Sequence, residues 1–318
     1  MDIDLFYGVI ALMCAVIAYV FRAPLVRIID RRLVESYPQW YATGLRFLIA
    51  FLVMMDIAYL APKRLLFIDP LLLFDVLPFL SGLFLTPWLL VTFKICMCLL
   101  LVPFVIGWWP RCARTVLFVM SVLMYTAATS NGKLDHGGHI VVLLLGACMI
   151  HAFLFPRRTH LRESDAALFM LSYAAVAVLY VTSVVSKLAS VRQLALWFDG
   201  EAFRAALVTK ETYVSAVAGA PTQLFTGIEG FFVYHVWASA VAGIILLLIE
   251  LSALFLPFVS ARKRTIIIAG LIVFHVTAIV VLHLVFRQNL YVLGYLLFVS
   301  VLHLISPRFS AMMGSARF

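Results

Sequence analysis

The sequence predicts an all-α protein, a polytopic transmembrane bundle of about nine spanning helices. Of its 318 residues, 65% are hydrophobic and 12% are charged, and this charged share is about half that of a soluble domain. The apolar runs are continuous and reach the roughly 20 residues that a helix needs to cross a bilayer. They do not alternate with polar residues as the strands of a membrane barrel do. Since lipid tolerates only helices and closed barrels, a helical bundle is the expected fold.

Nine apolar runs are predicted to span the membrane. In chain order they cover 5–21, 40–61, 88–109, 113–128, 137–155, 165–187, 236–259, 265–286 and 289–305. A further apolar run follows Pro70 and is interrupted by Pro78 and Gly82, so we expect a broken or re-entrant segment there. The loop at 188–235 is the largest region outside the membrane.

Basic residues predict the orientation of these helices. If the amino terminus lies outside, fourteen Lys and Arg residues fall on the inner side and eight on the longer outer loops, as the positive-inside rule requires. The carboxyl terminus is then cytoplasmic. The net charge is +9, but the arginines fall in short loops as topology signals do, so no nucleic acid partner is expected. Asp2 and Asp4 precede the first run, so no cleavable signal peptide is expected.

The sequence gives no reason to expect a metal site or a disulfide framework. The five cysteines are odd in number and lie in apolar runs or beside a basic loop. His136 and His139 have the H-x-x-H spacing, which can place two imidazoles on one helical face. The two glycines between them favour a turn, however, and neither a cysteine nor a second histidine pair completes a site.

Ten ionisable residues lie within the apolar runs, and each is a candidate functional residue because a charge inside the membrane is costly. They are Arg46, Asp56, Lys94, His139, His151, Lys187, Glu250, His275, His283 and His303. With the predicted orientation, five lie at similar depth towards the outside, namely Asp56, Lys94, His139, Lys187 and His283. Asp56 and Lys94 have a simpler interpretation as a structural ion pair. Glu250 and His275 lie deeper in consecutive antiparallel helices, and we predict that they lie within hydrogen-bonding reach of each other, directly or through a water.

Lys187 ends the sixth apolar run and has two interpretations. A lysine at the end of a hydrophobic helix commonly extends its ammonium group to the interface. Alternatively, apolar walls hold the amine partly neutral, so that it is available as a base. The segment from Trp197 to Asp199 follows in the sequence, and it is expected to close a pocket above Lys187.

The order of these features resembles that of the HTTM, or vitamin K-dependent γ-carboxylase-like, membrane protein family. The stretches that carry the resemblance are Arg46-Phe47 with Met55-Asp56, Gly107 to Tyr125, Asp135 to Leu145, and Ser183 to Gly200. Ile249-Glu250-Leu251 and Phe274-His275 match a late acidic position and a late Phe-His pair. The resemblance implies a family domain at 46–305, an extra helix and basic loop at 1–45, and a short cytoplasmic tail at 306–318.

The resemblance also implies roles for the candidate residues. Lys187 is similar to the base that deprotonates a reduced lipid quinone, and His139 assists it, with His136 as the second choice. The supporting charges are Asp56, Lys94, Glu250 and His275, and the pocket loop contains Trp197 and Asp199. The implied ligand is a lipid quinol near the outer face. The implied partners are membrane lipid and a secreted peptide or protein substrate.

Two features depart from the carboxylases of the family. A single lysine precedes Leu188 where the carboxylases have two, and the chain ends about a dozen residues after the last run, where they have a large extramembrane domain. Glutamate carboxylation is therefore not implied. The short bacterial members imply an alternative, a non-enzymatic inner-membrane partner in the maturation or export of a secreted peptide. A transporter with a proton path is disfavoured because no inverted repeat is found, whereas enzyme and partner both stay open.

Overall fold

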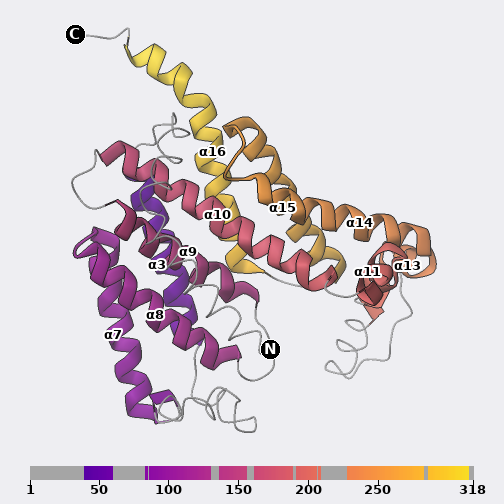
Figure 1. The fold of residues 1–318 in the computed structure, drawn as a ribbon, viewed down its shortest axis with the longest axis horizontal. Helices are drawn as coiled ribbons and strands as arrows, with labels where there is room; N and C mark the ends of the chain where they lie inside the picture. The colour runs from indigo at the N-terminus through magenta and orange to yellow at the C-terminus, as the bar shows by residue number, and fades with distance from the viewer. Residues whose placement is uncertain are drawn as a thin grey trace. The chain divides into compact units, whose positions relative to one another are not determined.

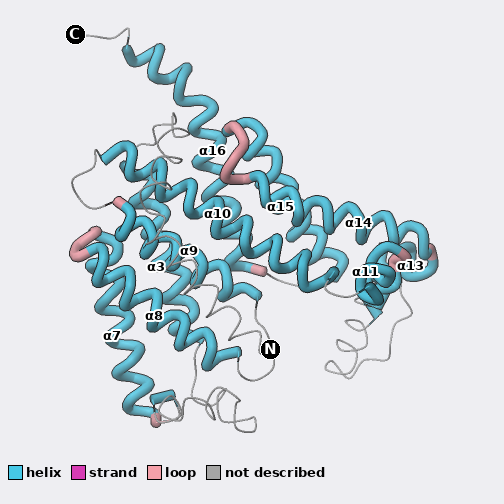
Figure 2. Tube along the Cα trace, in the orientation of Figure 1, coloured by secondary structure: helices cyan, strands magenta, loops and turns pink. Residues whose placement is uncertain are grey.

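The computed structural model describes residues 39–59, 83–84, 86–129, 136–155, 161–188, 191–205, 207–208, 228–282 and 286–314. Within these ranges the elements are helices and no strand occurs (Figure 1), which confirms the predicted all-α class. Figure 2 shows how short the described turns between the helices are. The elements are α3 (Gln39–Tyr59), α7 (Pro87–Ile106), α8 (Pro110–Thr129), α9 (His136–Leu154), α10 (Leu161–Leu188), α11 (Val191–Phe198), α13 (Ile228–Tyr234), α14 (Val236–Ser252), the 3-10 turn η1 (Ala253–Phe255), α15 (Ala261–Leu282) and α16 (Arg287–Gly314).

Five helices of the described ranges are long and apolar enough to cross a membrane, which is compatible with an integral membrane protein. They are Trp40–Ala58, Pro87–Ile106, Ala166–Leu188, Val236–Phe255 and Arg287–Ile305. The predicted run at 137–155 forms a shorter apolar helix, Gly138–Leu154. The runs at 113–128 and 265–286 fall largely in α8 and α15, which begin with basic residues and are not among the five.

The predicted count of about nine spans is therefore not confirmed. The run at 5–21 lies outside the described residues, as does nearly all of the broken segment that follows Pro70. The chain divides into two compact units, residues 1–175 and 176–318, and α10 contributes residues to both.

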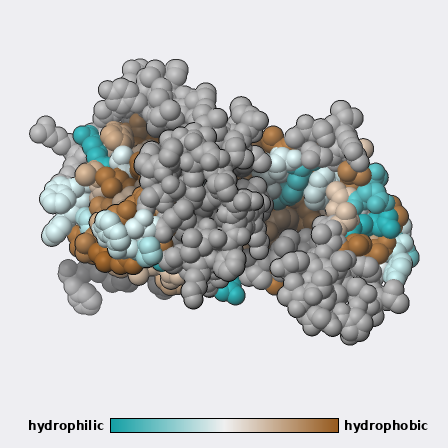
Figure 3. All heavy atoms as spheres, turned by 90° about the horizontal axis from the view of Figure 1, so that it is seen from below, coloured by the Kyte–Doolittle hydropathy of each residue, from teal (hydrophilic) through white to brown (hydrophobic). Residues whose placement is uncertain are grey.

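In the first unit, α7 is an apolar helix that is buried on one face only. Pro87 stands at its start, where a proline costs no helical hydrogen bond, and Gly107 ends it in the left-handed conformation with a φ of 82°. The buried residues recur every three or four positions and are Leu90, Phe93, Met97, Leu101 and Phe104. Large apolar side chains cover the rest of the helix and are exposed, and hydrophobic residues reach the molecular surface in Figure 3. Such a surface suits contact with lipid.

The helices α3, α7, α8 and α9 pack together in the first unit: α8 contacts α7 and α9, and α3 contacts the same two helices. The α8–α9 pair is antiparallel. Near one end Arg111 Nε donates to the carbonyl of Ala152 at 3.4 Å. Near the other end the rings of Tyr125 and His139 lie 4.6 Å apart.

The glycines of the H-x-x-H segment belong to α9, so the prediction of a turn between His136 and His139 is wrong. The reason is the close approach of α8. A Cβ atom at Gly138 would collide with the ring of Tyr125, and a side chain there would push the two helices apart. The glycine therefore serves helix packing rather than a turn.

In the second unit, α14 and α15 are joined through η1, and α15 also packs against α16. Arg264 at the start of α15 is turned inward and is buried. Its Nε donates to the carbonyl of Leu256 at 3.1 Å and its Nη2 to that of Val259 at 3.0 Å. Arg264 therefore satisfies two carbonyl groups of the turn between η1 and α15.

Two short helices, α11 and α13, pack against α14. The chain leaves α11 at Gly200, which has a φ of 83°. A Cβ atom at this position would lie 2.5 Å from the backbone nitrogen of Ala240 and 2.9 Å from the carbonyl oxygen of Val236. Only glycine allows both this left-handed conformation and this approach, and the approach holds α11 close to the backbone of α14.

Candidate functional site

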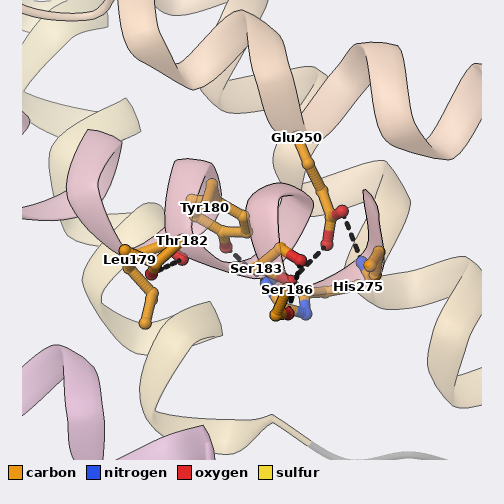
Figure 4. A network of polar contacts seen from close by, with 8 residues as sticks. Leu179, Tyr180, Thr182, Ser183, Ser186, Glu250 and His275 are labelled. Atoms are coloured by element: carbon orange, nitrogen blue, oxygen red, sulfur yellow. Dashed lines mark hydrogen bonds and ion pairs between the residues drawn. The ribbon is translucent and has the colours of Figure 1, made fainter. Parts of the chain in front are cut away.

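The candidate site lies in the second unit, where α10, α14 and α15 meet (Figure 4). The Lys187 amine near the end of α10 forms an ion pair with Oε2 of Glu250 on α14. One turn earlier on α10, the Ser183 hydroxyl donates to Oε1 of the same carboxylate at 3.3 Å. Both carboxylate oxygens of Glu250 are therefore bound by α10.

The sequence spacing explains this arrangement. Ser183 and Lys187 are four residues apart, so they lie on the same face of α10. Glu250 continues the buried face of α14 that includes Gly243 and Leu247. The Glu250 side chain is only 3% exposed, whereas the Lys187 side chain is 25% exposed. A carboxylate that is buried to this extent requires a counter-charge, and Lys187 provides it.

Aromatic side chains surround the Lys187 amine. Its Nζ lies 5.4 Å from the ring centroid of Trp197 and 5.9 Å from that of Phe274, within the range of cation–π attraction. Trp197 comes from α11, and it is held in place by packing against Gly243 of α14. The Lys187 amine therefore has the Glu250 carboxylate as its polar partner and the rings of Trp197 and Phe274 as its aromatic neighbours.

A second polar pair lies one turn further back along α10. The Tyr180 hydroxyl and His275 Nε2 of α15 are 2.5 Å apart, and both side chains are buried. His275 Nδ1 is also buried and has no hydrogen-bond partner in the described part of the chain. The ring of His275 contacts the rings of Phe274 and Phe286 at 5.0 and 5.2 Å.

The prediction of a direct hydrogen bond between Glu250 and His275 is therefore wrong. The two residues do lie on consecutive helices, but Glu250 is bound to Lys187 and Ser183, and His275 is bound to Tyr180. The physical reason is that α10 presents a polar face to both helices. Its groups reach the carboxylate and the imidazole separately.

Sequence reasoning missed two residues of this network, Tyr180 and Ser183. Their signal is present in the sequence as a spacing. Tyr180, Ser183 and Lys187 follow one another by three and then four residues within an otherwise apolar run, which predicts one polar face on a helix. Of the three residues, only Lys187 carries a charge, so only Lys187 was chosen as a candidate.

Trp197 and Asp199, the two residues of the predicted pocket loop, have surroundings that differ from each other. Trp197 lies over Lys187 as described above. The side chain of Asp199 is exposed, and its Oδ1 accepts a hydrogen bond from the backbone N–H of Glu201 at 2.9 Å. Asp199 thus stabilises the local turn after α11.

Four further candidates lie in the first unit. His139 is buried against the ring of Tyr125, and the side chain of His136 lies outside the described residues. Asp56 and Lys94 are half-buried on α3 and α7, two helices that pack together. Because His139 and Lys187 belong to different units, their common pocket stays a prediction.

The fold and the site together define a class of protein. It is a helical protein with membrane-length apolar helices and a lysine–carboxylate pair held between them. Comparison with protein-family models, with curated proteins and with solved structures gave no match. The resemblance to the HTTM family therefore rests on the residues of the sequence alone.

Proposed function

We propose that the chain is a membrane-embedded enzyme of HTTM type in which Lys187 takes a proton from a lipid-soluble quinol. The observation that carries the proposal is the Lys187–Glu250 ion pair. Charges among apolar helices are costly and mark functional sites by default. The quinol comes from the resemblance, and the flat faces of Trp197 and Phe274 beside the amine suit a planar aromatic ring.

The pair supplies a proton acceptor in two steps. A lysine accepts a proton only as a neutral amine, so the ammonium must first give its proton to the adjacent Glu250 carboxylate. In a low-dielectric site this transfer removes two charges at once, which offsets part of the cost of burying them. The neutral Nζ can then take the hydroxyl proton of the quinol. The products are a quinolate, an ammonium and a protonated Glu250 that can release its proton.

The test is quinolate formation by the purified full-length protein in lipid nanodiscs. A long-chain naphthoquinol is added under anaerobic conditions, and quinolate is followed by its absorbance. Lys187→Arg keeps the charge but cannot act as a base, so we expect a rate loss of about 10²–10⁴-fold, the usual contribution of a general base. Lys263→Arg, at an exposed lysine of α15, is the matched control and should keep the wild-type rate.

Two outcomes would count against this proposal. A Lys187→Arg variant with the wild-type rate would make the lysine a structural cation only. A wild-type protein that binds no quinol but purifies with a secreted peptide would favour the alternative, a non-enzymatic partner in peptide maturation or export.

A further inference from the structure

Arg114 on α8 is a buried arginine with neutral partners only. The residue is 6% exposed. Its Nη1 donates to the carbonyl of Cys148 at 3.1 Å and to Nδ1 of His151 at 3.0 Å, and its Nε has no hydrogen-bond partner among the described residues. A guanidinium stays protonated in proteins. Arg114 is thus a permanent buried charge, and no carboxylate among the described residues forms an ion pair with it.

The neighbours of Arg114 do not supply the missing negative charge. Arginine only donates hydrogen bonds, so His151 Nδ1 must be the acceptor, and the imidazole is neutral in this contact. The carbonyl of Cys148 contributes only a partial charge. Buried charges are normally paired, because an unpaired ion loses its hydration without compensation. The arrangement therefore indicates an anion that is not part of the described protein.

Two further arginines lie in the same part of the unit. Arg111 stands three residues before Arg114, on the same face of α8, and it is exposed. Arg46 of α3 is half-buried, and a Cβ atom at Gly107 would lie 2.6 Å from its Nη1. Arg46 and Arg114 both lie close enough to the Cys148 thiol to interact with it electrostatically. Arg46 therefore lies against the α7–α8 turn, and Arg111 and Arg114 belong to the beginning of α8, which follows that turn.

This turn lies at the end of a membrane-length helix. It consists of Gly107, Trp108 and Trp109, which follow the candidate span Pro87–Ile106. The two tryptophans are 60% and 73% exposed. Tryptophan is enriched at the level of the lipid headgroups, so both the helix end and the tryptophans place the turn at that level.

We infer that Arg114, Arg111 and Arg46 bind the phosphate of an anionic membrane lipid at the start of α8. Guanidinium groups bind phosphate through paired, charge-assisted hydrogen bonds, and the first turn of a 20-residue helix adds unpaired N–H groups. The acyl chains would follow the exposed apolar surface of α7. This site is separate from Lys187 and does not depend on the proposed enzyme activity.

The experiment measures lipid retention and thermal stability of the full-length protein. The protein is placed in phosphatidylcholine nanodiscs with and without phosphatidylglycerol, and retained lipid is counted by native mass spectrometry. We expect selective retention of phosphatidylglycerol by the wild type and about a tenfold loss in Arg114→Gln, as one charged hydrogen bond implies. Arg111→Gln should show a loss of the same kind, and because Arg111 is exposed this variant keeps the test informative if Arg114→Gln fails to fold.

Arg262→Gln is the control, since Arg262 is an exposed arginine in the first turn of α15, and it should retain phosphatidylglycerol like the wild type. Equal losses in Arg262→Gln and Arg111→Gln would overturn the site in favour of general surface charge. If both Arg111→Gln and Arg114→Gln retained phosphatidylglycerol like the wild type, these arginines would only bind carbonyl groups of α9, and the lipid site would be refuted. Inorganic phosphate and glycerol 3-phosphate in detergent form the last arm, and full stabilisation by either would identify a soluble anion instead of a lipid.

Discussion

Tyr180 and His275 are 95 positions apart in the sequence and share a hydrogen bond of 2.5 Å between α10 and α15. Both side chains are buried, and both belong to the second unit. The hydrogen bond lies next to the Lys187–Glu250 pair and uses the same face of α10. The two pairs are nonetheless separate, since no hydrogen bond among the described residues joins one pair to the other.

The first prediction tests that separation. Tyr180→Phe should lower the free energy of unfolding by about 1–3 kcal/mol, because it leaves buried His275 Nε2 without its partner. A double-mutant cycle with His275→Leu should show a coupling energy above about 0.5 kcal/mol. A double-mutant cycle between Glu250→Gln and His275→Leu should show almost no coupling energy. Urea unfolding in detergent micelles measures the free energies for both cycles. A Glu250–His275 coupling as large as that of Tyr180–His275 would restore the pairing that we rejected.

The second prediction concerns an asymmetry within the ion pair. Lys187→Met leaves a carboxylate that is 3% exposed without its counter-charge, so we expect a loss of about 3–5 kcal/mol in the free energy of unfolding. Glu250→Gln leaves a lysine that is 25% exposed and can turn to water, so the expected loss is about 1 kcal/mol. The double variant Lys187→Met/Glu250→Gln should be more stable than Lys187→Met alone. If Glu250→Gln proved the more damaging single change, Lys187 would be the more deeply buried partner.

The third prediction concerns Gly200, which holds α11 against α14. An alanine there must adopt a φ of 83° and fit a Cβ atom 2.5 Å from the backbone nitrogen of Ala240. We expect Gly200→Ala to lower the melting temperature and to weaken quinol binding, because Trp197 moves away from Lys187. Gly294→Ala is the control: no atom lies within 4 Å of the added Cβ, and alanine favours a helix over glycine by about 1 kcal/mol. Equal melting temperatures for the two variants would refute the backbone contact.

The fourth prediction concerns topology. Because α14 is a candidate span, the two chain segments that flank it should face opposite sides of the membrane. Reporter fusions after Arg264 should give cytoplasmic activity, and fusions within 205–225 should give activity outside, as the positive-inside rule predicts. Reporter activity on one side for both positions would exclude a spanning α14.

Sequence reasoning located the helices and the central lysine for sound physical reasons. Long apolar runs can only be helices in lipid, and Lys187 is conspicuous as a charge at the end of one. Depth along a helix can be counted from the sequence, so Glu250 and His275 were correctly assigned to consecutive helices. Their partners could not be predicted, because α14 and α15 are apolar around most of their circumference. The sequence then contains little information about which face of each helix meets α10.

The first unit illustrates the same limit. Arg114 is one of the fourteen basic residues that were assigned to the inner side, and its burial against Cys148 and His151 depends on the register of the α8–α9 pair. That register is set by the contact of Gly138 with Tyr125, which no local pattern reveals. The count of about nine spans stays a prediction, since five helices of the described residues are long and apolar enough to cross a membrane and the run at 5–21 lies outside those residues.

The length of α7 makes the first unit sensitive to the thickness of the bilayer. Its 20 residues, at about 1.5 Å each, extend about 30 Å, which is close to the hydrocarbon thickness of a typical membrane. Trp88 and Trp109 are exposed near its two ends and act as anchors a fixed distance apart. In a bilayer with shorter acyl chains, hydrophobic mismatch must be relieved by tilting of α7 or by local thickening of the lipid. If α7 spans the bilayer, acyl-chain length is thus a physical variable that changes the tilt of α7 without any change in the sequence.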